Sequence, residues 1–188
     1  MVLERVEYRG YHVAVGVYRL LGKDRIENFE RIIDELSGGD VIIELFNSEF
    51  IISLKQIVFA ALSAINAFLS ESNIARSLGI EILLRLSSET QIDRAIDKIG
   101  VNKNVDEVGV CIVSKDIDKL EETMRSLLQK ISTVEITEES LHSIDRVKKT
   151  VEFYNIRREE VESIQARDFY EAVLLIVLEK IATVDVER

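Results

Sequence analysis

The chain has 188 residues, of which 47% are apolar and 31% are charged, and its formal net charge is −10. This length and composition predict a single globular domain over residues 1–188 with a sizeable core, and they argue against disorder. The acidic balance excludes non-specific binding to DNA, RNA or anionic membranes, so any contact with nucleic acid has to be local.

The first third of the chain is expected to alternate strands and helices, because β-branched runs are followed by apolar residues at helical spacing. In chain order we expect a strand over 11–18, a helix over 24–36, a strand over 40–46, and a helix that Asn47 or Ser48 caps and that ends near Leu69. The last of these helices is apolar around most of its circumference.

Residues 76–92, RSLGIEILLRLSSETQI, combine an apolar run with two charges. As a strand over 78–86, the run places five apolar side chains on one face: Leu78, Ile80, Ile82, Leu84 and Leu86. Glu81 and Arg85 share the other face, where residues four apart are separated by about 13 Å, so each needs a partner elsewhere. Two alternatives remain open: a helix, in which the charges form an i,i+4 pair, and an edge strand whose polar face meets water.

The rest of the chain continues with well-marked elements. We expect a helix over 88–99 with a capping box of Ser88 and Gln91 and an end at Gly100, a strand over 107–113, a helix over 114–131, a strand over 133–136, and helices over 138–154 and 158–183. The fold class is therefore α/β or α+β, with a small sheet that is mixed or antiparallel in part and two helices that close the chain.

Chemistry of the kind that enzymes use is sparse in this sequence. No phosphate-loop, dinucleotide, zinc-protease or nucleophile-elbow motif is present, and neither His12 nor His142 has a second ligand at metal spacing. Cys111, the single cysteine, lies in an apolar run and fits a buried thiol in a reducing compartment, and the first ten residues do not resemble a cleavable leader. We therefore expect a cytoplasmic protein that is not an enzyme and that binds no cofactor or metal.

Two features point to binding instead of catalysis. Residues 173–178 are six consecutive apolar residues, which project all around a helix, so that helix is either wholly buried or half of a protein interface. Neither it nor the helix over 48–69 predicts a membrane span. A basic group near the segment 76–92 comprises Lys55, Arg76, Arg85 and Arg94, whereas the cations over 146–158 fit a solvated face.

Four stretches taken in order carry a family resemblance: Phe46-Asn47, SLGIEILLRLS, QIDRAIDKIGV and VLEKIATVDV. With them the chain resembles the small kinase-binding subunit of the KEOPS complex, the family of the human PRPK-binding protein. The resemblance covers about residues 40–113 and the C-terminal helix, and the first strand and helix match only in general pattern.

This resemblance implies a non-catalytic accessory subunit. KEOPS installs a threonylcarbamoyl group on the adenosine beside the anticodon of ANN-decoding tRNAs, and its catalysis lies on another subunit. Family members bind the small atypical kinase/ATPase of the complex, and through it the other KEOPS subunits, while archaeal members bind the 3′ CCA end of tRNA. The alternative is a pure protein adaptor that regulates the kinase without binding RNA; no contact with DNA or membrane is expected.

The resemblance also directs attention to two sets of residues. The candidates for the kinase interface are Phe50, Ile51, Leu54, Val58, Leu174, Leu175, Ile176 and Leu178. The candidates for RNA binding are Lys55, Arg76, Glu81, Arg85, Gln91 and Arg94, because a single-stranded end needs a few cations and polar groups. Many archaeal relatives have His at the position of Gln56 and Arg at that of Thr90, and if that Arg contacts RNA, Thr90 weakens tRNA binding here.

Overall fold

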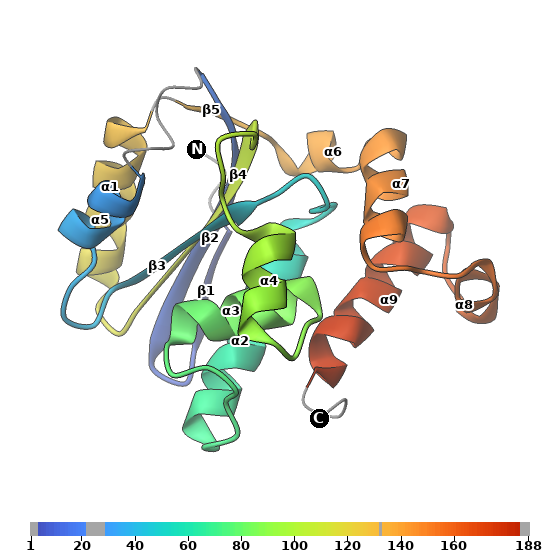
Figure 1. Cartoon of the computed structure of the whole chain (residues 1–188), viewed down its shortest axis with the longest axis horizontal. Coiled ribbons are helices and arrows are strands. Elements are labelled where there is room, and N and C mark those ends of the chain that lie inside the picture. The colour runs from blue at the N-terminus through green and yellow to red at the C-terminus, as the bar shows by residue number, and fades with distance from the viewer. Residues whose placement is uncertain (1–3, 22–28, 132, 185–188) are drawn as a thin grey trace.

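A computed structural model describes residues 4–21, 29–131 and 133–184 (Figure 1). Its described strands form one sheet in the order β1-β2-β4-β3, with β5 beside the end of β2. They are β1 (Glu4–Tyr8), β2 (Tyr11–Leu20), β3 (Ile42–Asn47), β4 (Glu107–Ser114) and β5 (Thr133–Glu135). The α+β class is confirmed, and the sheet, which we expected to be mixed, is antiparallel in every described pair.

Strand β1 was not anticipated from the sequence. It pairs with β2 through a tight hairpin in which Tyr8 lies opposite Tyr11. The two residues between them, Arg9 and Gly10, have φ angles of 50° and 79°, which matches the right-handed twist of the flanking strands. The alternating sequence ERVEY suits an edge strand with partly exposed faces.

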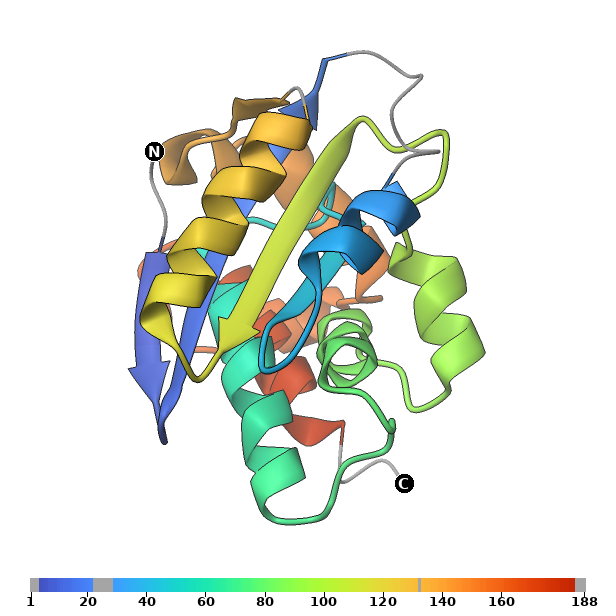
Figure 2. The same ribbon diagram turned by 90° about the vertical axis from the view of Figure 1, so that its left-hand side faces the viewer.

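The helices lie on both faces of the sheet. They are α1 (Phe29–Leu36), α2 (Leu54–Leu69), α3 (Leu78–Ser87), α4 (Ile92–Ile99), α5 (Ile117–Lys130), α6 (Glu138–Leu141), α7 (Ile144–Phe153), α8 (Arg158–Ser163) and α9 (Phe169–Thr183). Helices α1 and α5 cover one face, and α2, α3 and α9 lie beyond the other (Figure 2). Over the described stretches of chain, no helix has both the length and the apolar character of a membrane span.

Strand β4 lies at the centre of these layers, and all eight of its residues are buried. Val110 and Ile112 pack toward α1 and α5, whereas Cys111 and Val113 pack toward α2 and α9. Its continuous apolar sequence follows from this position, since a strand covered on both faces has no solvent side.

The predicted strand over 78–86 is wrong, because this segment is helix α3. Ser77 caps it by accepting a hydrogen bond from the backbone N–H of Ile80, and Ser88 ends it in the left-handed conformation at φ 56°. Nine of its ten residues are buried, since the helix lies among β3, α2, α4 and α9. A helix covered on all sides shows no polar stripe, so its sequence is indistinguishable by periodicity from that of a buried strand.

Two predicted helix starts are also wrong. Helix α2 begins at Leu54 and not after Asn47 or Ser48, because Ser53 forms the capping box with Gln56. Before it, residues 48–52 form a connection that buries Phe50, Ile51 and Ile52. Ser88 ends α3 and does not cap α4, whose N-cap residue Gln91 makes no side-chain capping bond.

The two long helices expected near the C-terminus are each interrupted. Residues 138–154 form α6 and α7, and residues 158–183 form α8 and α9 with a break over 164–168. Asp168 restarts the chain as a helix by accepting from the backbone N–H of Glu171. Of the predicted helix over 24–36, residues 29–36 form α1, and residues 24–28 lie outside the described residues.

Candidate functional site

A buried ion pair lies at the centre of α3. Arg85 donates to Glu81 Oε1 from Nη2 at 2.9 Å and from Nε at 3.2 Å, and the two side chains are 1% and 0% exposed. The residues are one helical turn apart, so the helix itself brings them together, as the helical alternative implied. Both were candidates for RNA binding, but in this structure the surrounding protein covers them.

The second oxygen of Glu81 holds the connection between α2 and α3. Oε2 accepts hydrogen bonds from the backbone N–H groups of Ile74 and Ala75, both at 2.8 Å. Ala75 is 1% exposed and belongs to one apolar cluster with Ala95 of α4. The carboxylate therefore fixes the residues directly before the exposed Arg76.

The remaining RNA candidates are exposed, but they lie in two places. Arg76 follows Ala75 and Arg94 precedes Ala95, two buried residues of one apolar cluster, and Gln91 is the N-cap residue of α4. Neither arginine has an ion pair with a described residue. Lys55 is at the start of α2, about 20 Å along the helix from the connection at its end (Figure 1).

Most of the apolar interface candidates are part of the core. Phe50, Ile51, Leu54, Val58, Leu174 and Ile176 are each at most 9% exposed, and Leu178 is half-buried. Leu175, in contrast, is 42% exposed on α9. Six of the eight candidates therefore stabilise the fold from inside, and of the candidates on α9 only Leu175 and Leu178 reach the surface.

The structure adds exposed apolar side chains on α2 that sequence reasoning missed. Phe59 is 36% exposed, and Leu62 is half-buried one turn further along. Helices α2 and α9 start side by side, where the Tyr170 hydroxyl donates to the Ile52 carbonyl at 3.1 Å, and they run in the same general direction (Figure 1). The spacing of Phe59 four residues after the exposed Lys55 was the signal available in the sequence.

We call Phe59, Leu62, Leu175 and Leu178 the α2–α9 stripe. Lys55 is close enough to Glu171 to help lower the pKa of that carboxyl, which Arg167 lowers most through a hydrogen bond. Phe59 follows Lys55, and Leu175 follows Glu171, by one helical turn in each helix. The charged pair therefore marks one end of the stripe, and the apolar side chains continue from it across both helices.

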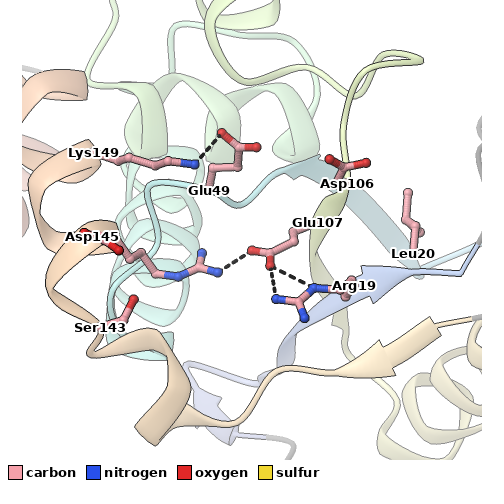
Figure 3. Close-up of a pocket in the computed structure, with 9 residues that line it drawn as sticks. Arg19, Leu20, Glu49, Asp106, Glu107, Ser143, Asp145 and Lys149 are labelled. Carbon is pink, nitrogen blue, oxygen red and sulfur yellow. Dashed lines mark hydrogen bonds and ion pairs between the residues drawn. The ribbon is translucent and has the colours of Figure 1, made fainter.

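A polar cavity of about 430 Å³ lies where β2 ends and β4 begins, beside α7 (Figure 3). Glu107 lies at its centre between two arginines: Arg19 Nη2 donates to Oε1 at 2.8 Å, and Arg146 donates to Oε2. These hydrogen bonds outweigh partial burial and lower the pKa of Glu107. Arg146 also donates to the Ser48 carbonyl at 2.8 Å, so the cluster ties α7 to the 48–52 connection.

This arrangement explains the cations over 146–158. Arg146 belongs to the cavity, Lys149 pairs with Glu49 across it, and Arg158 pairs with Glu162 within α8. Acidic and basic groups alternate around the cavity, so no single sign of charge dominates it. The cluster is suited to joining α7 to the sheet, and it does not resemble an anion site.

Glu44 on β3 is a half-buried acid of a different kind. No described residue gives it a hydrogen bond or ion pair, and burial raises its pKa to about 8. It packs against α3 at Gly79, where an added Cβ would come within 2.3 Å of Glu44 Oε2. A larger residue at position 79 would therefore require the Glu44 carboxylate to shift.

The histidines and the cysteine form no chemical site. His142 Nε2 is 3.5 Å from Glu138 Oε1, and its ring lies 4.3 Å from that of Tyr170. Cys111 is buried, and burial together with the nearby Glu44 raises the pKa of its thiol. In the part of the chain that the structure describes, no three acidic, histidine or cysteine side chains are grouped as metal ligands.

Comparison with known proteins supplies the biological context for these surfaces. A sequence model of the family described as kinase binding protein CGI-121 matches residues 24–185. The chain is also similar to the regulatory protein Cgi121 of Methanocaldococcus jannaschii, with 29% identity over 140 residues, which cover 71% of this chain and 88% of that protein. The residues that the family model matches include both α3 and the α2–α9 stripe.

Proposed function

This chain belongs to the CGI-121 family of kinase-binding proteins, and from that membership we propose that it is a non-catalytic accessory subunit of the KEOPS complex. In this role it binds the small atypical kinase of the complex and brings tRNA to it through the 3′ CCA end. The family membership and the name of the archaeal relative support a kinase partner and a regulatory role. The tRNA part rests on the resemblance and on the exposed arginines beside α4.

The α2–α9 stripe is the observation that carries the kinase-binding proposal. An interface of this kind needs a water-excluding apolar centre with a polar rim. Phe59 and Leu175 provide exposed apolar anchors, and Lys55 and Glu171 lie at their edge. Burying Phe59 and Leu175 against a partner would remove an exposed apolar side chain of each helix from water together.

Leu175→Asp tests this assignment. The side chain is 42% exposed, so the variant should fold, and the charge should weaken binding to the purified KEOPS kinase at least tenfold in calorimetry. Ile117→Asp is the matched control, because Ile117 is 39% exposed on α5, across the sheet from the stripe. Unchanged kinase affinity of the folded Leu175→Asp protein would exclude the stripe as the docking surface.

The tRNA proposal is supported by the place where Arg76 and Arg94 emerge. Arg76 and Arg94, which have no ion pair with a described residue, each adjoin an alanine of one buried cluster, and with the exposed Gln91 they offer phosphate contacts and polar groups for base edges. A single-stranded end requires only such a small area, whereas a duplex would meet the repulsion of a chain with net charge −10. Lys55 is too distant along α2 to contribute to the same contact.

Binding of intact tRNA and of tRNA that lacks its terminal CCA, each at two salt concentrations, tests the tRNA proposal. Loss of affinity on trimming, with a shallow salt dependence, is expected for recognition of the end through few phosphates. Equal weak binding of both RNAs would favour the second candidate, a protein adaptor that regulates the kinase without binding RNA. The burial of Glu81, Arg85 and Gln56 favours that candidate, since it removes three polar groups from any RNA surface.

A further inference from the structure

The buried pair on α3 has no evident value as an isolated stabilising contact. Removing two charges from water costs several kcal/mol per ion, and similar pairs are often replaced by apolar residues without loss of stability. The pair also makes hydrogen bonds to the protein backbone. Glu81 uses one oxygen for Arg85 and the other for two consecutive N–H groups, those of Ile74 and Ala75.

Those two N–H groups lie in a connection that has no regular structure to satisfy them. Residues 70–77 join α2 to α3, and backbone donors that are buried in such a segment need a partner. Because one carboxylate oxygen accepts both hydrogen bonds, it restricts the backbone of residues 74–75 to a single conformation. Arg85 donates to the other oxygen of the carboxylate, Oε1, and balances its charge.

The fixed segment ends at Arg76. Ala75, whose N–H is held, is buried in the cluster with Ala95, and the next residue emerges into solvent. The backbone on which Arg76 stands is therefore attached on one side to α3 and on the other to α4. A guanidinium that starts from a fixed backbone loses less conformational freedom on binding than one on an unsupported loop.

We infer that Glu81 and Arg85 are positioning residues for RNA binding: from inside the protein they fix the backbone of residues 74–75 so that Arg76 is presented to the phosphate of a single-stranded RNA end. This inference rests on the proposed tRNA role and concerns the same site. Neither Glu81 nor Arg85 touches the RNA, and the effect of each passes through Arg76.

A double-mutant cycle of Glu81→Gln and Arg76→Ala tests this dependence. Glutamine keeps the shape of the side chain but has one acceptor oxygen where glutamate has two, so it cannot serve both Arg85 and the two N–H groups. We expect Glu81→Gln to weaken binding of CCA-ended tRNA about five- to tenfold, and Arg76→Ala to weaken it by at least as much. Because one residue acts through the other, the double variant should bind no more weakly than Arg76→Ala alone.

Three further measurements separate positioning from a general structural effect. Kinase affinity and affinity for trimmed tRNA should stay within twofold in Glu81→Gln. Amide hydrogen exchange at Ile74 and Ala75 should accelerate at least tenfold in that variant. Glu35→Gln, which breaks the exposed pair of Glu35 with Lys130 across the sheet, is the matched control and should change none of these quantities.

The outcomes distinguish this inference from the proposed function. If Glu81→Gln weakens tRNA binding equally with and without Arg76, or leaves it unchanged while Arg76→Ala weakens it, the positioning role is wrong and the RNA site stands. If Arg76→Ala has no effect, the RNA site itself is wrong. Should Glu81→Gln not fold, Arg85→Lys replaces it in the cycle, because lysine keeps the charge but not the two-point hold on Glu81, and the same outcomes decide.

Discussion

Helix α3 and the α2–α9 stripe reverse the usual distribution of side chains in opposite ways. In α3, a glutamate and an arginine are at most 1% exposed, inside a helix that the rest of the protein covers. On α2 and α9, a phenylalanine and a leucine are 36% and 42% exposed where polar residues are the norm. Burying the charges costs desolvation free energy, and exposing the apolar side chains costs hydration free energy, so each region calls for a structural or functional reason.

The contrast teaches that the two regions serve different kinds of contact. The charges in α3 are satisfied within the molecule and act on its backbone, whereas the stripe leaves apolar side chains exposed, as the proposed contact with a kinase requires. Substitutions in α3 should consequently lower the free energy of unfolding. Changes in the stripe should leave the isolated protein intact and appear in its complexes.

The largest expected effect is that of Arg85→Ala. It leaves the Glu81 carboxylate buried without its cation, which should lower the free energy of unfolding by about 3–5 kcal/mol. Urea denaturation measures this loss. Lys130→Ala, which breaks an exposed pair, should cost less than about 1 kcal/mol, and an equal cost for the two variants would remove the distinction drawn for α3.

The next effect concerns Glu44 and depends on pH. Its pKa is raised to about 8 in the folded protein, whereas an unfolded chain ionises it near 4.5. The folded state therefore holds the proton more tightly, and the contribution of Glu44 to stability falls as pH rises from about 4.5 to about 8. Partial solvent access limits this loss to about 1–3 kcal/mol.

Glu44→Gln should remove that pH dependence, because glutamine does not titrate. Melting temperatures at pH 5 and pH 8 measure it: the difference between the two should be several degrees smaller in the variant than in the native protein. The exposed Glu179→Gln serves as the control and should leave the difference unchanged. An unaltered difference in Glu44→Gln would show that Glu44 is ionised in the folded protein at neutral pH.

A smaller effect is expected at the start of α3. Ser77→Ala removes the hydroxyl that accepts from the Ile80 N–H, at a cost of about 1 kcal/mol. Ser77→Asp keeps an acceptor and should retain most of the stability in the same denaturation experiment. If alanine and aspartate behave alike, burial of α3 holds the helix without its cap.

The smallest effect on stability is expected in the stripe itself. Leu175→Asp should change the free energy of unfolding by no more than about 0.5 kcal/mol. The neighbouring Ile176 is 2% exposed, so Ile176→Asp should unfold the protein. Circular dichroism melts of the two variants compare the outer and inner sides of one helix, and similar melting temperatures would contradict the assignment of those sides.

Much of the fold could be predicted from local signals. The strands at 11–20, 42–47 and 107–114 combine β-branched residues with clear ends, and α5 has a regular apolar stripe. The site was less accessible, because Glu81 and Arg85 are of types that are usually exposed, and the apolar interface candidates are of types that occur both in cores and at interfaces. Their burial depends on which helices pack over them.

Charge, length and the order of motifs were sufficient to establish an acidic α+β protein with the pattern of a kinase-binding family. They could not distinguish a strand from a helix over residues 78–86, because a segment covered on every side lacks the polar stripe that reports its period. Only the tertiary structure decided that Glu81 and Arg85 face each other inside α3, and that Phe59 and Leu175 face outward together. The exposure of a side chain depends on which elements pack around its own, and the sequence of a single element does not contain that information.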